Sequence, residues 1–363
     1  MRVPDGIVFL AGRLGSLDDG WPLAALVDRL DHRAVRCRIV CLSRGRWPEG
    51  DPRVLELPAL GNRWLRPLAI RRLRLERQLE DVCLLHVLHD ELAAAGLALA
   101  EALAIPYLLT VDDFATLDHG LKLSRRYFRG LVATAAELAA DFVDALDFPA
   151  AMISLVAPGI GDPPGCDRTT RGNIPVVGAA GVPRTGSGFS CFLEAAGKVI
   201  ASGRDTEFLI ASQGKGLDEL RRQAQSLRVA DRVTVADFTT LSERFYGALD
   251  VYCQPSLVPS TGRTLTLALA EAVPSVASRV RGLESLIDHG RSGLLVPPGD
   301  SQALAAGLIE LLDDRDKATR LGLFAQETIL DRFNLDRQAG LLIDLYRDCL
   351  GVASPSAWEP RPS

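Results

Sequence analysis

The sequence predicts an α/β protein built from two doubly wound domains, each with a parallel sheet that is buried on both faces. Three observations support this prediction. The chain of 363 residues is long enough for two domains with full hydrophobic cores. Short β-branched runs alternate with longer stretches of helical periodicity. The alternation breaks near Pro158, in a segment rich in glycine and proline, and then starts again.

The first half begins with strand–helix–strand alternation. Residues 6–12, GIVFLAG, read as a buried strand, and residues 22–32 as a helix that opens with a proline. Further strands are expected at 37–43 (CRIVCLS), 82–89 (VCLLHVLH) and 106–113 (PYLLTVDD), with a helix at 91–103. Strands joined by helices in this way pair in parallel and are covered on both faces.

The second half repeats the pattern after the break. Strands are expected at 175–181, 207–212 and 231–238, with helices at 189–203 and 217–228. Two more strands, VYCQPS and VPSVAS, flank a helix that starts at about Leu265. We therefore divide the chain into a first domain (1–158), a linker (159–174), a second domain (175–334), a last long helix (335–350) and a disordered tail (351–363).

Composition argues against several classes of protein. The net charge of -5 is not that of a nucleic-acid binder. The seven cysteines are scattered without a C-x-x-C pair, which argues against a zinc site and a disulfide framework and fits a reducing cytosol. The apolar run near residue 6 is too short for a secretory signal, and no segment has the apolar length of a membrane span. We expect a soluble, cytoplasmic protein.

The second half resembles glycosyltransferase family 4, a group of retaining GT-B enzymes. PVVGAAGVPRTGSGF (175–189) looks like the family's first strand and glycine loop, and ERFYGALDVYCQPSL (243–257) like the segment that leads to its donor motif. The closest piece is 276–314, VASRVRGLESLIDHGRSGLLVPPGD and the helix that follows it. The first half matches more weakly, at DVCLLHVLHD, IPYLLTVDDF and ATAAELAADF.

This resemblance implies a fold and a reaction. The fold would be GT-B: two Rossmann-like domains that face a cleft, with helix 335–350 crossing back to pack on the first domain. The second domain would hold a nucleotide-sugar donor, and the first a glycan, lipid-linked or small-molecule acceptor. Transfer would retain the anomeric configuration without a metal or other cofactor. Such chemistry depends on neutralising and positioning the donor diphosphate.

Five positions depart from the family's usual functional residues. Val182 and Ser187 stand where the family has a basic pair, Pro259 and Leu267 where it has two glutamates, and Asp112 where it has a histidine. Each charge-assisted bond lost is worth roughly 1.5–3 kcal/mol. Two hypotheses follow: a transferase with a rewired donor site, or an inactive pseudo-glycosyltransferase that serves as a binding or scaffold subunit of an active partner glycosyltransferase. A different GT-B reaction, such as sugar epimerisation, is a third.

Replacements for the missing groups are present on the donor side. Arg184 and Arg263 carry positive charge, and the glycines of the first loop would let the backbone approach a phosphate. The segment 260–266 offers hydroxyl groups and the free N–H groups of a helix start. The predicted donor-binding residues are Arg184, Gly186, Ser187, Gly188, Lys215, Ser260, Thr261, Gly262, Arg263, Thr264 and Glu284. The alternative is that the arginines are ordinary solvated loop residues and that Glu284 caps a helix start.

Three features of the first half also bear on function. Asp112 and Asp113 end a predicted strand, where they would act as general base or acceptor ligand, or would cap a turn or helix. His86 and His89 are three residues apart on a strand, which is poor geometry for one metal ion and favours packing or an acceptor role. Residues 63–80 contain six arginines and a tryptophan, which is typical of a helix at the inner face of a membrane or of a solvated surface helix.

Overall fold

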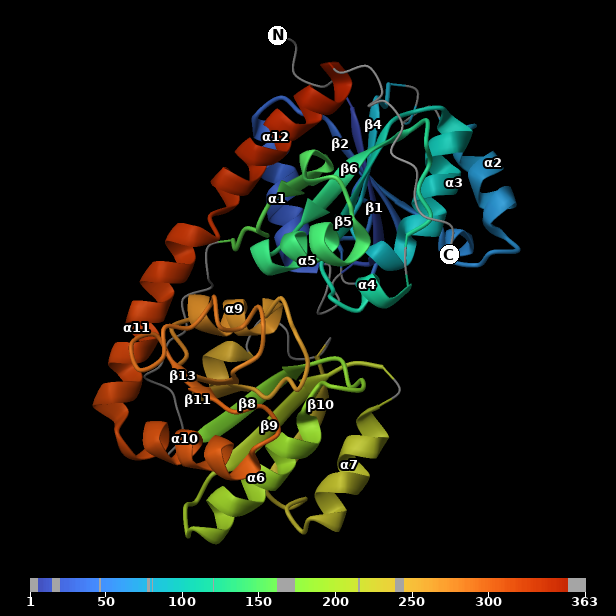
Figure 1. The fold of residues 1–363 in the computed structure, drawn as a ribbon. Coiled ribbons are helices and arrows are strands. Elements are labelled where there is room, and N and C mark those ends of the chain that lie inside the picture. Colours follow the sequence, from blue (N-terminus) through green and yellow to red (C-terminus); the bar gives the residue numbers. More distant parts are fainter. Residues whose placement is uncertain are drawn as a thin grey trace. The chain divides into compact units, whose positions relative to one another are not determined.

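The structure is a computed structural model that describes residues 6–14, 20–45, 47–76, 79, 81–119, 121–161, 174–214, 216–238 and 245–351. The chain divides into two compact units (Figure 1). The first contains the residues up to Gly161 together with those from Phe333, and the second contains Asp162–Arg332. Most of the predicted linker and nearly all of the predicted tail lie outside the described residues.

The first unit alternates strands and helices along the chain. Its elements are β1 (Ile7–Arg13), α1 (Gly20–His32), β2 (Cys37–Ser43), β3 (Val54–Glu56), α2 (Arg66–Leu73), β4 (Leu84–Val87), α3 (Ala93–Leu103), β5 (Tyr107–Val111), α4 (Thr116–His119), β6 (Phe128–Ala133), α5 (Ala136–Leu146), β7 (Ile153–Leu155) and, from the end of the chain, α12 (Leu335–Gly351). The strands form one sheet in the order β3-β2-β1-β4-β5-β6-β7.

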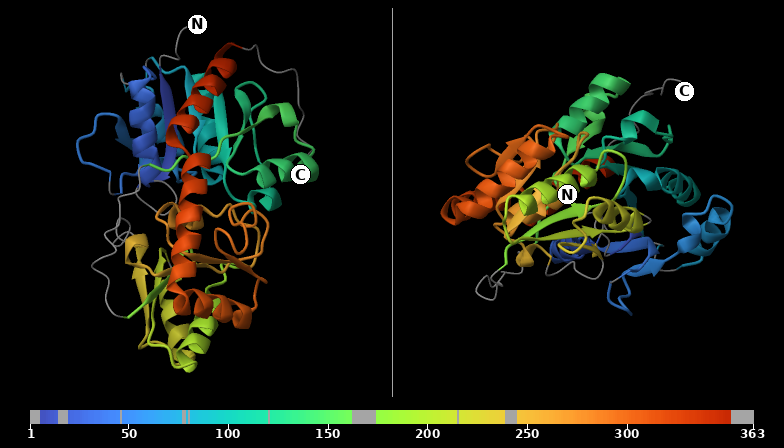
Figure 2. Two further views of the ribbon diagram at one scale, coloured as in Figure 1. Left: turned by 90° about the vertical axis from the view of Figure 1, so that its left-hand side faces the viewer. Right: turned by 90° about the horizontal axis from the view of Figure 1, so that it is seen from below.

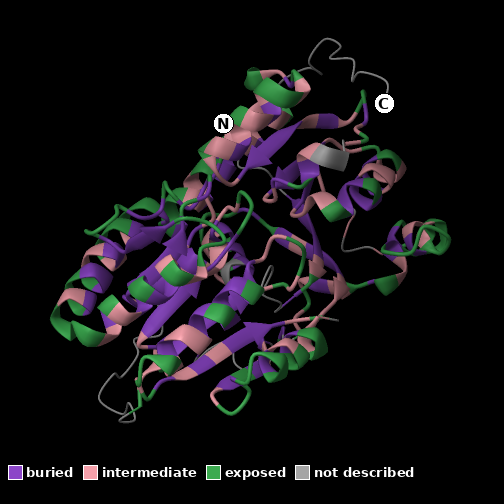
Figure 3. Ribbon diagram, turned by 60° about the horizontal axis from the view of Figure 1, so that its bottom comes forward, coloured by how far each residue is buried: buried purple, intermediate pink, exposed green. Residues whose placement is uncertain are grey.

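Strand β1 shows why this sheet is buried on both faces. Val8 and Leu10 belong to the apolar cluster that includes Leu99 of α3, whereas Ile7 and Phe9 belong to the cluster on the other side. Successive side chains of a strand point to opposite faces, so an uninterrupted apolar run fills two cores at once. Every pairing between the described strands of this sheet is parallel, and Figure 3 shows the strands of the fold as mainly buried ribbon.

Helix α12 belongs to the core of the first unit although it ends the described chain. Leu335, Ala339, Leu342 and Tyr346 are buried in the cluster that contains Ile7 and Phe9. Figures 1 and 2 show α12 beside α1. A Cβ atom on Gly159 would lie 2.5 Å from the Cα of Leu335, so the chain approaches the start of α12 too closely for any larger residue.

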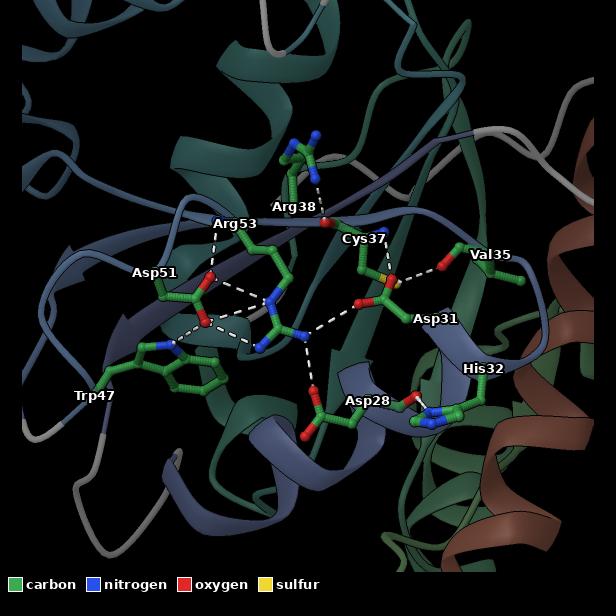
Figure 4. A network of polar contacts seen from close by, with 9 residues as sticks. All are labelled: Asp28, Asp31, His32, Val35, Cys37, Arg38, Trp47, Asp51 and Arg53. Carbon is green, nitrogen blue, oxygen red and sulfur yellow. Dashed lines mark hydrogen bonds and ion pairs between the residues drawn. The ribbon is translucent and has the colours of Figure 1, made fainter.

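Ion pairs and hydrogen bonds connect the end of α1 to the residues just before β3, the edge strand of this sheet (Figure 4). The Arg53 guanidinium donates to Asp28 at 2.7 Å and to Asp31 at 3.0 Å, both on α1. It also donates to Asp51 at 2.9 Å, and the Trp47 indole donates to the same carboxylate at 3.0 Å. The pKa of Asp51 is lowered to about 2, mainly by hydrogen bonds from the Arg53 side chain.

The second unit has a smaller sheet. Its elements are β8 (Val176–Gly181), α6 (Phe189–Ala201), β9 (Glu207–Ser212), α7 (Leu217–Ser226), β10 (Val233–Asp237), β11 (Val251–Gln254), α9 (Arg263–Ala270), β12 (Ser275–Ser278), β13 (Leu294–Val296), α10 (Ser301–Asp313) and α11 (Arg315–Arg332). The strand order is β10-β9-β8-β11-β12-β13, again with every described pairing parallel.

The prediction of two doubly wound parallel-sheet domains is confirmed. Strands β2 and β9 have the predicted bounds. Strands β3, β6, β7 and β13 were not predicted, and α9 begins at Arg263 rather than near Leu265. The earlier start follows from Gly262, whose φ of +70° ends the preceding loop directly before the helix. No helix among the described residues is long and apolar enough to cross a bilayer.

Candidate functional site

In the second unit, loops that follow the strands meet at one edge of the sheet. The order of the strands reverses between β8 and β11, and ligands of doubly wound sheets bind beyond the strand ends at such a point. The loop 182–188 follows β8, and the loop 255–262 follows β11. Leu257 N–H donates to the Gly186 carbonyl at 2.8 Å, which joins the two loops directly.

Glycines make this close approach possible. Gly188 has a φ of +78° and precedes α6, and a Cβ atom there would lie 1.7 Å from the Pro255 carbonyl oxygen. Gly186 has a φ of +86°, and its Cβ would lie 2.8 Å from the Val258 side chain. Both positions therefore require glycine for conformation and for space.

The loop after β9 lies against the same region. A Cβ atom on Gly216, at the start of α7, would come within 2.4 Å of the Pro183 side chain. The Ser212 hydroxyl donates to the Gly181 carbonyl at 2.7 Å, so the ends of β8 and β9 are also joined. Lys215, which was predicted to bind the donor, lies outside the described residues.

Helix α9 presents its N-terminus at this edge. Gly262 precedes the helix, and its carbonyl accepts the first helical bond, from Thr266 N–H at 2.8 Å. The N–H groups of the first turn thus lack partners within the helix and carry the positive end of its dipole. Arg263 is the first helical residue and is half-buried. This end of α9 is therefore suited to an anion.

A buried polar network supports the start of α9. The Gln254 side-chain oxygen accepts hydrogen bonds from the Tyr252 hydroxyl and from the Thr264 hydroxyl, both at 2.8 Å. The Gln254 side-chain amide donates to the Ser256 hydroxyl at 3.0 Å. This network was not predicted, although a glutamine at the end of an otherwise buried strand indicates a need for polar partners.

Hydrogen bonds within the protein engage several of the hydroxyl groups that were predicted to bind the donor. Thr264 gives its hydroxyl proton to Gln254, so that proton is engaged within the protein. The Ser260 hydroxyl accepts from Gly262 N–H at 3.2 Å, in a local turn. Thr261 and Arg184 also have partners within the protein. The backbone N–H groups and Arg263 are therefore the stronger anion-binding candidates.

The remaining predicted donor residues lie on neighbouring segments. Ser187 closes a turn through its N–H bond to Arg184 at 3.0 Å. Glu284 is exposed on the 281–286 segment, and that segment touches the loop after β11 because Ser260 N–H donates to the Arg281 carbonyl. Of the departures from the family pattern, Val182 and Pro259 are exposed, and Leu267 is half-buried on α9.

At the strand ends of the first unit, Asp112 and Asp113 have different partners. Asp112 Oδ2 lies 3.1 Å from Nδ1 of His89, which follows β4. Asp113 Oδ1 accepts from Ala115 N–H at 3.0 Å, a capping contact just before α4. The contact between His89 and Asp112 was not predicted, because it depends on the pairing of β4 with β5.

Asp90 lies beside this pair. Its carboxylate accepts a hydrogen bond from the buried Thr116 hydroxyl. Burial is the main cause that raises the pKa of the Asp90 carboxyl, and the charges of Asp112 and Asp113 raise it further. His86, by contrast, is buried inside the sheet. Among the described residues, no three side chains of the metal-binding types converge.

The surface around α2 combines apolar and basic side chains. Trp64 is 77% exposed, Leu68 65% and Leu75 79%, which is unusual for residues of this size. Arg63 lies over the Trp64 ring at 4.8 Å. Further arginines of this segment are Arg66, Arg71, Arg72 and Arg74. Residues 77, 78 and 80 of the predicted basic segment lie outside the described residues.

Comparison with known proteins gives a family match over part of the chain and a shared fold over most of it. Residues 173–314 match the family model described as Glycosyl transferases group 1. The chain is 31% identical over 254 residues to D-inositol 3-phosphate glycosyltransferase of Corynebacterium urealyticum, across 64% of this chain and 59% of that protein. It is 28% identical over 178 residues to alpha-D-kanosaminyltransferase of Streptomyces kanamyceticus, across 48% of this chain and 46% of that protein. The chain thus spans about half the length of these curated relatives.

A solved structure extends the likeness over nearly the whole chain. Anabaena HepE in complex with UDP-glucose matches with a TM-score of 0.75 and 17% identity, covering 94% of this chain and 99% of that chain. The match confirms the fold that the sequence predicted, GT-B.

Proposed function

We propose that this chain is a GT-B glycosyltransferase that transfers a sugar from a nucleotide-sugar donor to a glycan, lipid-linked or small-molecule acceptor. The observation that carries the proposal lies in the second unit. The segment that matches the family contains the glycine loop after β8 and the loop 255–262 that leads to α9. The bond from Leu257 N–H to the Gly186 carbonyl joins these two loops at the reversal point of the sheet.

The donor diphosphate would bind at this edge, with retention of the anomeric configuration. Gly186 and Gly188 let the loop after β8 pack closely against the loop after β11. The N–H groups at the start of α9 would donate to the phosphate oxygens. Arg263 supplies the charge that the family's basic pair usually brings. A charge-assisted bond of this kind contributes roughly 1.5–3 kcal/mol. The UDP-glucose named for the HepE complex supports a nucleoside diphosphate sugar as donor.

The acceptor would be held by the first unit, and the surface around α2 would bring the protein to an anionic membrane. Trp64, Leu68 and Leu75 offer apolar groups for the interfacial region. Arginines next to them attract anionic headgroups, by about 1 kcal/mol each. Peripheral binding of this type is suited to a lipid-linked acceptor.

Calorimetric titration with UDP, GDP, UDP-glucose and GDP-mannose tests the donor site. We expect micromolar binding of one nucleotide series that weakens at least tenfold in Arg263→Ala. Arg222→Ala is the matched control, because Arg222 is an exposed arginine of α7 that pairs with Glu219. Failure of every nucleotide to bind at millimolar concentration would refute the proposed function.

A further inference from the structure

One glutamine links the end of β11 to the first turn of α9. Gln254 is the last residue of β11 and is 8% exposed. Its side-chain oxygen accepts from the Thr264 hydroxyl, and its side-chain amide donates to the Ser256 hydroxyl. The same buried side chain therefore contacts both the loop after β11 and the second residue of α9.

The first turn of α9 has no side-chain cap. Gly262 precedes the helix, and no side chain accepts a capping bond at this end. Asp300 shows the more usual arrangement in the same unit, because its carboxylate accepts from the N–H groups of Gln302 and Ala303 at the start of α10. Without such a cap, the first N–H groups of α9 remain available to a ligand, and the position of the turn depends on other contacts.

The Thr264 hydroxyl makes such a contact. It lies 2.8 Å from the Gln254 oxygen, which also accepts from the Tyr252 hydroxyl at 2.8 Å. Tyr252 is fully buried on β11, so the first turn of α9 is anchored in the interior of the second unit. Satisfied hydrogen bonds in such an interior make the structure rigid, because the local dielectric is low and each lost bond is costly.

Two groups beside this turn lack partners among the described residues. The half-buried Arg263 side chain forms no hydrogen bond or ion pair with them, and the Tyr246 hydroxyl is buried without a hydrogen-bond partner. Burial is the main cause that raises the pKa of Tyr246, and the charge of Arg263 opposes the rise, so the two groups are within electrostatic range of each other. An unpaired cation next to uncapped N–H groups favours an anionic ligand.

We propose that Gln254 is a positioning residue of the diphosphate site, which fixes the first turn of α9 through Thr264. The inference rests on the proposed function. Gln254 acts through Thr264 and does not itself contact the donor. Its neutrality matters as well. A glutamate at this place could accept the same hydroxyl bonds, but its charge would repel an anion at the start of α9.

The test compares Gln254→Leu, Gln254→Glu, Thr264→Val and the double variant of Gln254→Leu with Thr264→Val. Gln326→Leu is the matched control, because the Gln326 amide donates to the Ala270 carbonyl at 2.7 Å and so holds the opposite end of α9. Calorimetry measures UDP-glucose affinity between pH 5 and pH 8, a range in which its diphosphate keeps its charge. Thermal unfolding measures the stability of each variant separately.

We expect Gln254→Leu to weaken UDP-glucose binding at least tenfold, and Gln326→Leu to change it less than threefold although both variants lose stability. The double variant should bind no more weakly than Gln254→Leu, because both substitutions break the same link. Gln254→Glu should bind at least tenfold more weakly than the wild type at pH 8, and this deficit should shrink toward pH 5 as the carboxyl takes up a proton. A merely structural role would not give that pH dependence. If Gln254→Leu does not fold, Thr264→Val and Gln254→Glu still test the link and the charge.

The failures can be told apart. If the wild type binds UDP-glucose and the Gln254 variants keep its affinity within threefold at pH 8, the role of Gln254 is refuted and the proposed function stands. Equal losses in Gln254→Leu and Gln326→Leu would refute it too, because any loosening of α9 would then suffice. A deficit of Gln254→Glu that is constant with pH would refute the role of charge. If the wild type binds no nucleotide or nucleotide sugar, the proposed function fails, and the inference fails with it.

Discussion

The imidazole of His86, on β4, hydrogen-bonds the hydroxyl of Tyr346, on α12, across 2.7 Å. Its other ring nitrogen lies 2.8 Å from the Thr110 hydroxyl on β5. All three side chains are buried, so this contact ties the last helix to the centre of the first unit by polar bonds as well as by apolar packing. Burial lowers the pKa of His86 to about 3, which keeps the ring neutral.

Because His86 is buried and neutral, we expect the folded protein to lose stability in mild acid. The pKa in the folded state lies below the ordinary value of 6.5, so the unfolded chain binds the proton more readily. The contribution of neutral His86 to the free energy of unfolding is therefore complete above pH 6.5 and declines as the pH falls toward 3. Urea unfolding at pH 7.5 and pH 5.0 should show a drop about 2 kcal/mol larger in the wild type than in His86→Gln. An equal drop in both proteins would contradict this role.

The Arg53 network predicts a second pH effect, in stronger acid. The pKa of Asp51 is about 2, below its ordinary value of 3.8, so its contribution is present above pH 3.8 and is lost as the pH falls to 2. Asp51→Asn should lower the free energy of unfolding by about 1–2 kcal/mol at pH 6, with the difference vanishing near pH 2. Asp28→Asn is the control. Because the Asp28 side chain is 56% exposed, this substitution should lower the free energy of unfolding by less than about 1 kcal/mol.

Two neighbouring tyrosines should respond differently to the loss of their hydroxyl group. The Tyr246 hydroxyl is buried without a hydrogen-bond partner among the described residues, whereas Tyr252 donates to Gln254. Tyr246→Phe should be neutral or stabilising, because it removes an unsatisfied group. Tyr252→Phe should cost about 1–2 kcal/mol and weaken donor binding by loosening the start of α9. Thermal unfolding and UDP-glucose titration of both variants measure the contrast.

Glycine in the loop after β8 should be indispensable for donor binding. In Gly188→Ala, the new methyl group would lie 1.7 Å from the Pro255 carbonyl and would force the two loops apart. We expect a loss of UDP-glucose affinity of more than tenfold. Gly203 has a similar φ of +84°, but a Cβ atom there would have no neighbour within 4 Å. Gly203→Ala is therefore the control for backbone strain alone. It should lower stability by about 1 kcal/mol and leave donor affinity unchanged. Equal affinities in the two variants would show that the loop contact is unimportant.

The surface around α2 should bind anionic vesicles. We expect flotation with vesicles that contain phosphatidylglycerol, weakened by high salt and by the double substitution Trp64→Ala with Leu68→Ala. Leu323→Ala, at a 55% exposed leucine of α11, is the control and should float like the wild type. Flotation that is unaffected by the double substitution would place the membrane contact elsewhere.

The strands that the sequence analysis found are those with long apolar runs, such as β2 and β9. Strand β3 has three residues, and β6 is interrupted by Arg129 and Gly130, so neither has a clear strand pattern. In the site, Gly186 and Gly188 could be predicted because their need for glycine is local. The pairing of His89 with Asp112 and the Gln254 network could not, since they depend on which strands are neighbours and which side chains are buried together.

The place of α12 in the first unit has a consequence for the order of events during synthesis. The second unit is one continuous stretch, residues 162–332, and its whole sequence is synthesised before α12. Roughly 185 residues separate Gly161 from Tyr346, which at ordinary translation speeds corresponds to roughly 10–40 seconds. Until then, the apolar face around Ile7 and Phe9 lacks its final cover. The half of the molecule that is translated first is thus the last to complete its core.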